Sequence, residues 1–220
     1  MTVRQIANQR NAMYRPELAF SQIYFDARCD VAKDKSFPCK WVPKDSKEVT
    51  KKNFDPGFKI PMENVGLGAA KSVSISWSFP LEKTVDEVNA LCKKLNASEA
   101  FVFKDGKLVK SVGEARHISY WENQRNLHFD YVLPVSTQRS AIMVQVPDTF
   151  IQLYSAFVFL ETQRNADEWN YKAPPLVANV EYLDIGNMKH KAVFDFQFEV
   201  ISIEKGGKVF DGYFDCHKRK

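Results

Sequence analysis

Apolar and polar residues alternate along much of the chain after residue 71, with the period of two that predicts β-strands. The clearest early run is Ser72–Phe79, in which Val73, Ile75, Trp77 and Phe79 share one face while mostly serines occupy the other. This pattern predicts a strand that buries one face against a core and leaves the other face in water.

The same alternation returns near the end of the chain. Gly206-Gly207 separates a long run of alternating residues from a second predicted strand over Val209–Phe214, and we expect the two strands to form a hairpin. The apolar row of the first of these strands is Ala192, Phe194, Phe196, Phe198 and Val200.

Further hairpins are predicted where turn residues separate apolar runs. Asp105-Gly106 suits a type I′ turn, because both central residues of that turn have positive φ. The strand pairs are Ala100–Lys104 with Lys107–Ser111, His117–Trp121 with Leu127–Leu133, and Ala141–Val146 with Gln152–Leu160. In the second pair we expect a buried row of Leu127, Phe129, Tyr131 and Leu133. Single strands are predicted over Ala19–Cys29, with Ile23, Phe25 and Ala27 on one face, and over Leu176–Leu183.

One segment has helical spacing instead. Thr84 and Glu87 form a capping box, and residues 85–96 carry Val85, Val88, Leu91, Cys92 and Leu95 at intervals of three and four. The chain is therefore predicted to be mainly β, as an antiparallel β-sandwich, jelly roll or barrel with one flanking α-helix at about 84–96. Residues 1–18 are expected to form an N-terminal arm or short helix, and residues 19–220 a single β-rich domain.

Composition supports a globular β protein with an uneven charge distribution. Of the 220 residues 45% are apolar, and Phe, at 17, outnumbers Gly, at 9, as expected for aromatic side chains packed on pleated sheet. Residues 1–60 carry 12 Lys and Arg against 7 Asp and Glu, or +5, and the remaining residues carry 19 against 20, or −1. A basic first segment suits contact with nucleic acid, anionic lipid or acidic protein, although solvated surface charge also explains it.

The long segment 30–61 lacks any period and is the main candidate for binding. It interleaves lysines with aromatic residues and prolines, a combination in which the lysines could neutralise phosphates while exposed aromatics stack on bases. The alternative is that the aromatics attach a long loop to the core while the lysines stay solvated. The candidate binding residues are Lys33, Lys35, Phe37, Lys40, Trp41, Lys44, Lys51, Lys52, Phe54 and Phe58.

No catalytic or metal-binding motif is present, and we expect neither a metal nor another cofactor. His117 and His128 could face each other across residues 122–126, with Asp130 nearby, but outward-facing polar residues on a hairpin explain them as well. The cysteines, at positions 29, 39, 92 and 216, lack zinc-binding spacing and are expected to be free thiols, although a bridge between Cys29 and Cys39 stays open.

These observations favour a non-enzymatic structural or assembly protein that contacts itself or other subunits through the arm and the 30–61 loop. With its arm, long insertion and flanking helix, the organisation resembles virion or tail-tube subunits, at the level of architecture only. One alternative is a single-stranded nucleic-acid-binding β-barrel protein, and another is a carbohydrate- or small-ligand-binding module. No secretion signal is visible and the longest apolar stretch, Ala156–Leu160, is short, so we expect a cytoplasmic location or an assembled particle and no membrane partner.

Overall fold

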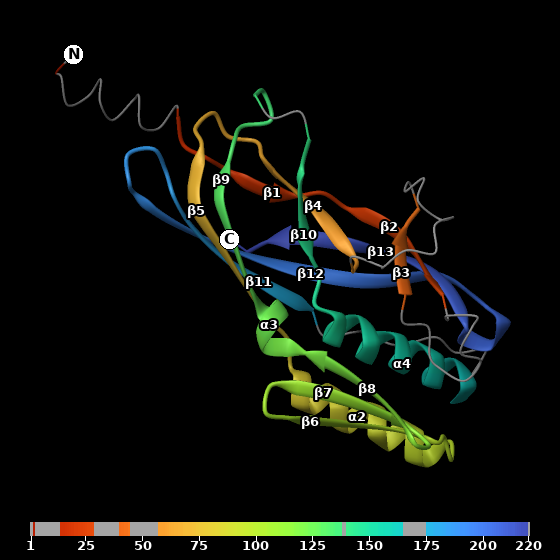
Figure 1. The fold of residues 1–220 in the computed structure, drawn as a ribbon. Helices are drawn as coiled ribbons and strands as arrows, with labels where there is room; N and C mark the ends of the chain where they lie inside the picture. Colours follow the sequence, from red (N-terminus) through yellow and green to blue (C-terminus); the bar gives the residue numbers. More distant parts are fainter. Residues whose placement is uncertain are drawn as a thin grey trace.

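The computed structural model describes Thr2 and residues 14–28, 40–44, 57–137, 140–164 and 175–219. Its described part is mostly β, with a curled antiparallel sheet of seven strands and two smaller sheets (Figure 1), which confirms the predicted fold class. The predicted arm over residues 1–18 falls mostly outside the described residues.

The seven-stranded sheet has the order β3-β2-β13-β12-β11-β5-β9, and each neighbouring pair is antiparallel. The strands are β2 (Ile23–Arg28), β3 (Lys40–Pro43), β5 (Ala70–Ser78), β9 (Asn126–Val132), β11 (Leu176–Leu183), β12 (Lys189–Glu204) and β13 (Val209–Lys218).

Two three-stranded antiparallel sheets complete the β structure. The first has the order β1-β4-β10, with β1 (Leu18–Phe20), β4 (Lys59–Asn64) and β10 (Ile142–Gln145). The second has the order β6-β7-β8, with β6 (Glu99–Lys104), β7 (Lys107–Val112) and β8 (Ala115–Tyr120). At the outer edge of β6, the side chain of Asn89 hydrogen-bonds the backbone of Phe101 twice, donating from Nδ2 to the carbonyl at 2.7 Å and accepting from the amide at 2.9 Å.

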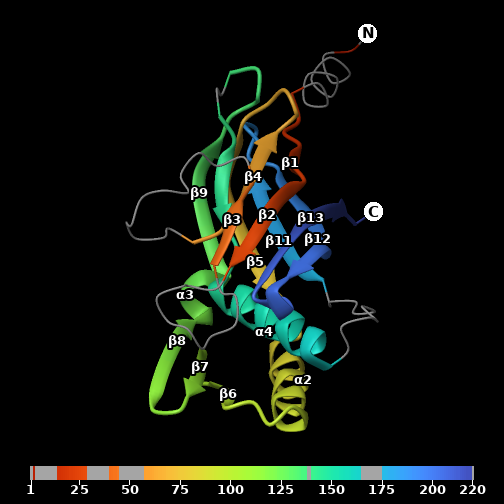
Figure 2. The same ribbon diagram turned by 90° about the vertical axis from the view of Figure 1, so that its right-hand side faces the viewer.

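Three α-helices occur in the described residues: α2 (Leu81–Lys94), α3 (Trp121–Arg125) and α4 (Asp148–Arg164), with a 3-10 turn, η1 (Lys205–Gly207), between β12 and β13. Helix α4 crosses below the main sheet, and α2 with β6–β8 lies beyond it (Figure 2). None of the helices in the described part of the chain is long and apolar enough to cross a membrane.

The buried residues follow the alternation in the sequence closely. Val73, Ile75 and Trp77 are buried on β5, as predicted, and so are the predicted phenylalanines of β12. Aromatic rings fill the space between β2, β13 and α4. For example, the ring centroid of Phe25 lies within 6.4 Å of the ring centroids of Trp41, Phe58, Phe198, Phe210 and Phe214. Burial of such side chains is the main favourable term in folding.

The strand predicted over Gln152–Leu160 is wrong, because these residues belong to helix α4. Ten residues of α4 are buried, on all sides of the helix, so the sequence has no polar face and therefore no helical period. A continuous apolar run of this kind cannot be assigned to helix or strand by its period alone.

The limits of the predicted helix and the partners of two predicted strands also differ from the prediction. The helix predicted at 84–96 begins earlier, at Leu81, and Thr84 donates its hydroxyl to the carbonyl of Pro80, at 2.8 Å, instead of capping the helix. The predicted pairing of His117–Trp121 with Leu127–Leu133 is wrong, since helix α3 separates β8, which pairs with β7, from β9, which pairs with β5.

Three further predictions hold only in part. In the row predicted to be buried on β9, Leu127 and Phe129 are half-buried but Tyr131 and Leu133 are exposed. The first predicted strand is divided between β1 and β2, which join different sheets, with Phe25 and Ala27 buried as expected. The segment 30–61, predicted to lack regular structure, contains β3 and the start of β4.

Candidate interaction surface

Asn64, the last residue of β4, joins three segments of the chain at one end of the molecule. Its side chain is fully buried and makes four hydrogen bonds. Oδ1 accepts from the amides of Glu17 at 3.0 Å and Gly66 at 3.1 Å, while Nδ2 donates to the carbonyls of Gly68 at 2.7 Å and Val132 at 3.0 Å. All the hydrogen-bonding capacity of this amide is used, so the loops around it are held in fixed positions.

The loop between β4 and β5 packs tightly on the segment that precedes β1. A Cβ atom added at Gly68 would lie 1.7 Å from the carbonyl oxygen of Tyr14, and one added at Gly66 would lie 2.4 Å from that of Arg15. Glycine is therefore required at both positions for the backbones to approach each other. The hydroxyl of Tyr182 on β11 also donates to the carbonyl of Pro16, at 3.3 Å.

Large apolar side chains are exposed on the loops that Asn64 joins and on the neighbouring hairpin between β11 and β12. Of the fourteen exposed large apolar residues in the described part of the chain, seven lie here, on loops that gather at the upper end in both views (Figures 1 and 2). We name this surface the apolar end, and its residues are Tyr14, Val65, Leu67, Leu133, Val135, Ile185 and Met188. Isolated exposed apolar residues are normal, but a group of them on neighbouring loops marks a contact surface.

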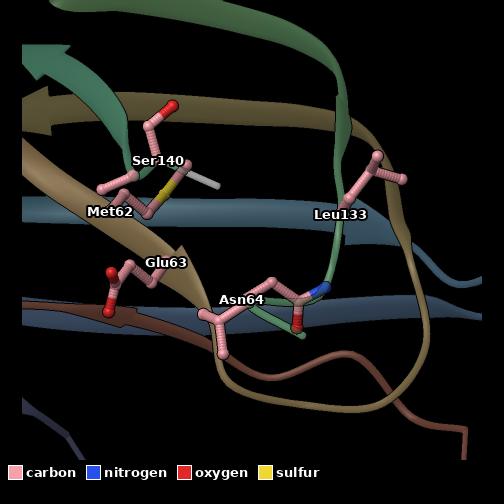
Figure 3. A pocket seen from close by; sticks show the side chains of 7 residues that line it. Met62, Glu63, Asn64, Leu133 and Ser140 are labelled. Atoms are coloured by element: carbon pink, nitrogen blue, oxygen red, sulfur yellow. The ribbon is translucent and has the colours of Figure 1, made fainter. Parts of the chain in front are cut away.

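A small pocket opens between β4 and the connection from β9 to β10 (Figure 3). Its volume is about 230 Å³, below the range of roughly 300–1,000 Å³ typical of small-molecule sites. A pocket of this size suits one inserted side chain better than a cofactor. It is lined by Met62, Glu63, Asn64, Leu133, Val135, Ser140 and Ala141.

The hairpin between β11 and β12 brings Ile185 and Met188 to the apolar end, and a buried polar pair supports it. His190 Nε2 lies 3.0 Å from Asp184 Oδ2, and the ring of His190 stacks on that of Tyr182 at 5.2 Å. Burial acts to raise the pKa of Asp184, but hydrogen bonds from His190 and from the Met188 amide outweigh it and hold the pKa below its ordinary value. The hairpin is thus fixed by hydrogen bonds to the Asp184 carboxylate beneath its apolar tip.

The structure separates the residues predicted to bind through the 30–61 loop. Trp41 and Phe58 are buried in the aromatic core, at 3% and 2% exposure, so neither offers a face for stacking on a base. Lys44 forms an ion pair with Asp211, which raises the pKa of Lys44, and Lys40 lies exposed on β3. Six candidates, Lys33, Lys35, Phe37, Lys51, Lys52 and Phe54, lie outside the described residues, so the binding role of this loop stays a prediction.

No pairing of His117 with His128 exists, because the two lie on strands of different sheets. His128 instead neighbours Ser74 and Asp130: Ser74 Oγ lies 3.3 Å from His128 Nδ1, and His128 Nε2 lies 3.6 Å from Asp130 Oδ1. These are residue types of a nucleophilic triad, but the histidine and aspartate side chains are 56% and 89% exposed on an open sheet face. Water screens such an arrangement. The described residues contain no group of three or more His, Cys, Asp and Glu that could hold a metal.

Comparison of the chain with known proteins identifies no relative. No protein-family model, curated protein or solved structure matches the chain. Its functional interpretation therefore rests on the surface itself. One feature of the sequence points to the apolar end, although it is not a periodic pattern. In short loops, apolar residues stand beside Gly, Pro or Asp, where no strand face has to be filled; these are Val65, Leu67, Val135 and Ile185.

Proposed function

We propose that the protein is a non-enzymatic assembly protein whose copies contact one another through the apolar end. The observation that carries this proposal is the group of seven exposed apolar side chains on loops that Asn64 and the His190–Asp184 pair hold in place. A fixed apolar surface loses little conformational entropy when it is covered, which favours association.

The sequence before Tyr14 supports a second copy of the chain as the partner. Residues 3–13 directly precede this surface in the sequence and contain Val3, Ile6, Ala7 and Met13 among polar residues. Each copy thus carries both an apolar surface and an apolar segment that could cover the surface of a neighbour. Exchange of terminal segments of this kind is a common route to oligomers. A subunit of a larger particle, of the virion or tail-tube type, is the form of assembly that this organisation favours.

Size-exclusion chromatography with light scattering over a wide concentration range tests the proposal. We expect wild-type protein to exceed the 25.3 kDa mass of one chain at high concentration. The double variant Leu67→Asp with Val135→Asp should shift the protein toward the monomer, because a charge in a covered apolar contact is unfavourable. Deletion of residues 1–13 should have the same effect, because it removes the segment proposed to cover the neighbouring copy.

Ile201→Asp is the matched control. Ile201 is 53% exposed, comparable to Leu67, but lies toward the opposite end of β12 from Met188. This variant should assemble like the wild type. A wild-type protein that remains monomeric at the highest concentration reached, or an assembly lost equally with Ile201→Asp, would contradict the proposal.

A further inference from the structure

The sheet β6-β7-β8 presents an outer face whose composition differs from that of the main sheet. Its inner face is covered, since Phe101, Leu108 and Ser119 are buried against the helices. The residues between them on each strand point outward, and the strand register aligns them in three rows across the sheet. We call this surface the β6–β8 face.

The middle row of the β6–β8 face is apolar. Val102 pairs with Val109 and Val109 with Ile118 across the three strands. Val102 and Ile118 are 55% and 50% exposed, and Val109 is half-buried. The three side chains form a short apolar strip that crosses the outward face of the sheet.

Cations flank this strip on both sides. Lys104 pairs with Lys107 in one neighbouring row, and Arg116 pairs with Ser111 in the other. Rows on one face are two residues apart, so each lies about 7 Å from the apolar strip. Of the carboxylates near these rows in sequence, Asp105 and Glu114 stand in the turns between the strands. Glu99 begins β6 and shares the alternation of Phe101, on the inner face.

These three cations have no carboxylate partner within 4.0 Å among the described residues, whereas several cations on or beside the main sheet have one. Lys189 and Lys191 both contact Glu181, and Arg219 contacts Asp195. Lys44 is paired with Asp211 in the same way. The cations of the β6–β8 face therefore remain available to an external polyanion.

An aromatic side chain completes the face. Tyr120 is 44% exposed and lies in the same row as Lys107, whose Nζ is 5.5 Å from the centre of the ring. A phenol ring beside a lysine can stack on a base while the ammonium contacts the adjoining phosphate.

We propose that the β6–β8 face binds single-stranded nucleic acid. Cations on both sides of an apolar strip, with an aromatic ring in one flanking row, match a chain of phosphates with stackable bases. An anionic membrane fits less well, because the strip is only one row deep and its valine and isoleucine side chains are too short to reach far into lipid. The proposal is independent of assembly through the apolar end, which lies at the other end of the molecule (Figure 2).

The test is fluorescence anisotropy of a labelled oligothymidylate titrated with the full chain at several salt concentrations. Replacing Lys104, Lys107 and Arg116 with Gln together should weaken binding and reduce the slope of log affinity against log salt by about 2, because each neutralised phosphate adds about 0.7 to that slope. Tyr120→Ala should weaken binding roughly 5- to 150-fold, whereas Tyr120→Phe, which keeps the ring, should bind like the wild type.

A matched control removes three positive charges from helix α2, which packs on the inner side of the β6–β8 sheet. Lys83, Lys93 and Lys94 on α2 are exposed, and their joint replacement with Gln should leave both affinity and salt slope nearly unchanged. Circular dichroism checks that each variant is folded. Absence of binding at low salt, or equal loss of binding in the α2 variant, would overturn the proposal. So would co-sedimentation with phosphatidylserine vesicles that depends on the β6–β8 cations when the oligonucleotide does not bind.

Discussion

Trp41 on β3 and Ser155 on α4 are 114 positions apart, and the indole Nε1 of Trp41 donates a buried hydrogen bond of 2.8 Å to the hydroxyl of Ser155. The same indole stacks on Phe25, at 4.3 Å, and on Phe198, at 5.3 Å between ring centroids. One aromatic residue of the basic segment therefore attaches the edge strand β3 to the sheet and to the helix at the same time.

Removal of either partner of this hydrogen bond should destabilise the fold. Ser155→Ala leaves the indole N–H buried without an acceptor, which we expect to cost about 1–3 kcal/mol in the free energy of unfolding. Trp41→Phe keeps an aromatic ring but has no N–H, so adding Ser155→Ala to it should cost clearly less than Ser155→Ala alone. Urea unfolding of the two single variants and the double variant measures this coupling. Strictly additive effects would contradict it.

Asn64→Ala should loosen the loops of the apolar end and destabilise the protein. It leaves two amides and two carbonyls in a buried environment without partners, and we expect a loss of about 3 kcal/mol or more. Hydrogen exchange at the amides of Glu17 and Gly66 should also become faster than in the wild type. Asn179→Ala, at an exposed position on β11, is the control and should change neither quantity. Unchanged exchange in Asn64→Ala would mean that other contacts position these loops.

Stability should fall in acid partly through Asp184. Its pKa in the folded protein is below the ordinary value of 3.8, so the unfolded chain takes up the proton more readily. The stabilisation is therefore present above that value and is lost as the pH falls through the lower pKa of the folded state. Urea midpoints measured from about pH 5 downward should decrease more for the wild type than for Asp184→Asn. Parallel curves for the two proteins would show that this carboxyl does not contribute.

Ser74 should not behave as a catalytic nucleophile. Its histidine and aspartate neighbours are 56% and 89% exposed, and water weakens the electrostatic interactions by which such neighbours would activate a hydroxyl. We expect a fluorophosphonate probe to leave Ser74 unmodified, as judged by mass spectrometry of the labelled protein. Labelling that disappears in both Ser74→Ala and His128→Ala would instead support a hydrolytic function.

The two described cysteines should react slowly with alkylating agents. Burial raises the pKa of the Cys92 thiol to about 11 and that of Cys216 to about 12, so little thiolate exists near neutral pH. Iodoacetamide at about pH 8 should label either residue at least about 100-fold more slowly in the native than in the urea-unfolded protein. Peptide mass spectrometry measures both rates, and equal rates would contradict their burial.

Much of the fold could be predicted because the strands of the main sheet bury one face only. Phe194 and Phe196 alternate with half-exposed neighbours, and the Asp105-Gly106 turn has positive φ at both residues, at 52° and 69°, as its sequence predicts. Helix α4 escapes prediction for the opposite physical reason. Residues such as Phe150 and Val158 are buried on all its sides, which removes the contrast that a period requires.

The candidate surfaces depend on relations that periodicity does not contain. Leu67 and Val135 are 68 positions apart, and the pairing of β5 with β9 together with the hydrogen bonds of Asn64 brings their loops together. The Asp105-Gly106 turn already sets Val102 opposite Val109, but Ile118 joins their row through the pairing of β7 with β8, which the sequence prediction missed. In the segment 30–61, composition alone could not show whether Trp41 is buried or exposed, and in the structure it is buried.

The double contact of Asn89 with Phe101 also affects how this protein can aggregate. An edge strand normally offers a free amide and carbonyl that template the addition of a foreign strand, which is the first step of fibril growth. On β6 a side-chain amide, fixed on a helix, already occupies one such pair. An incoming strand would have to displace it before it could join, so this edge of the small sheet resists polymerisation without needing charge or proline.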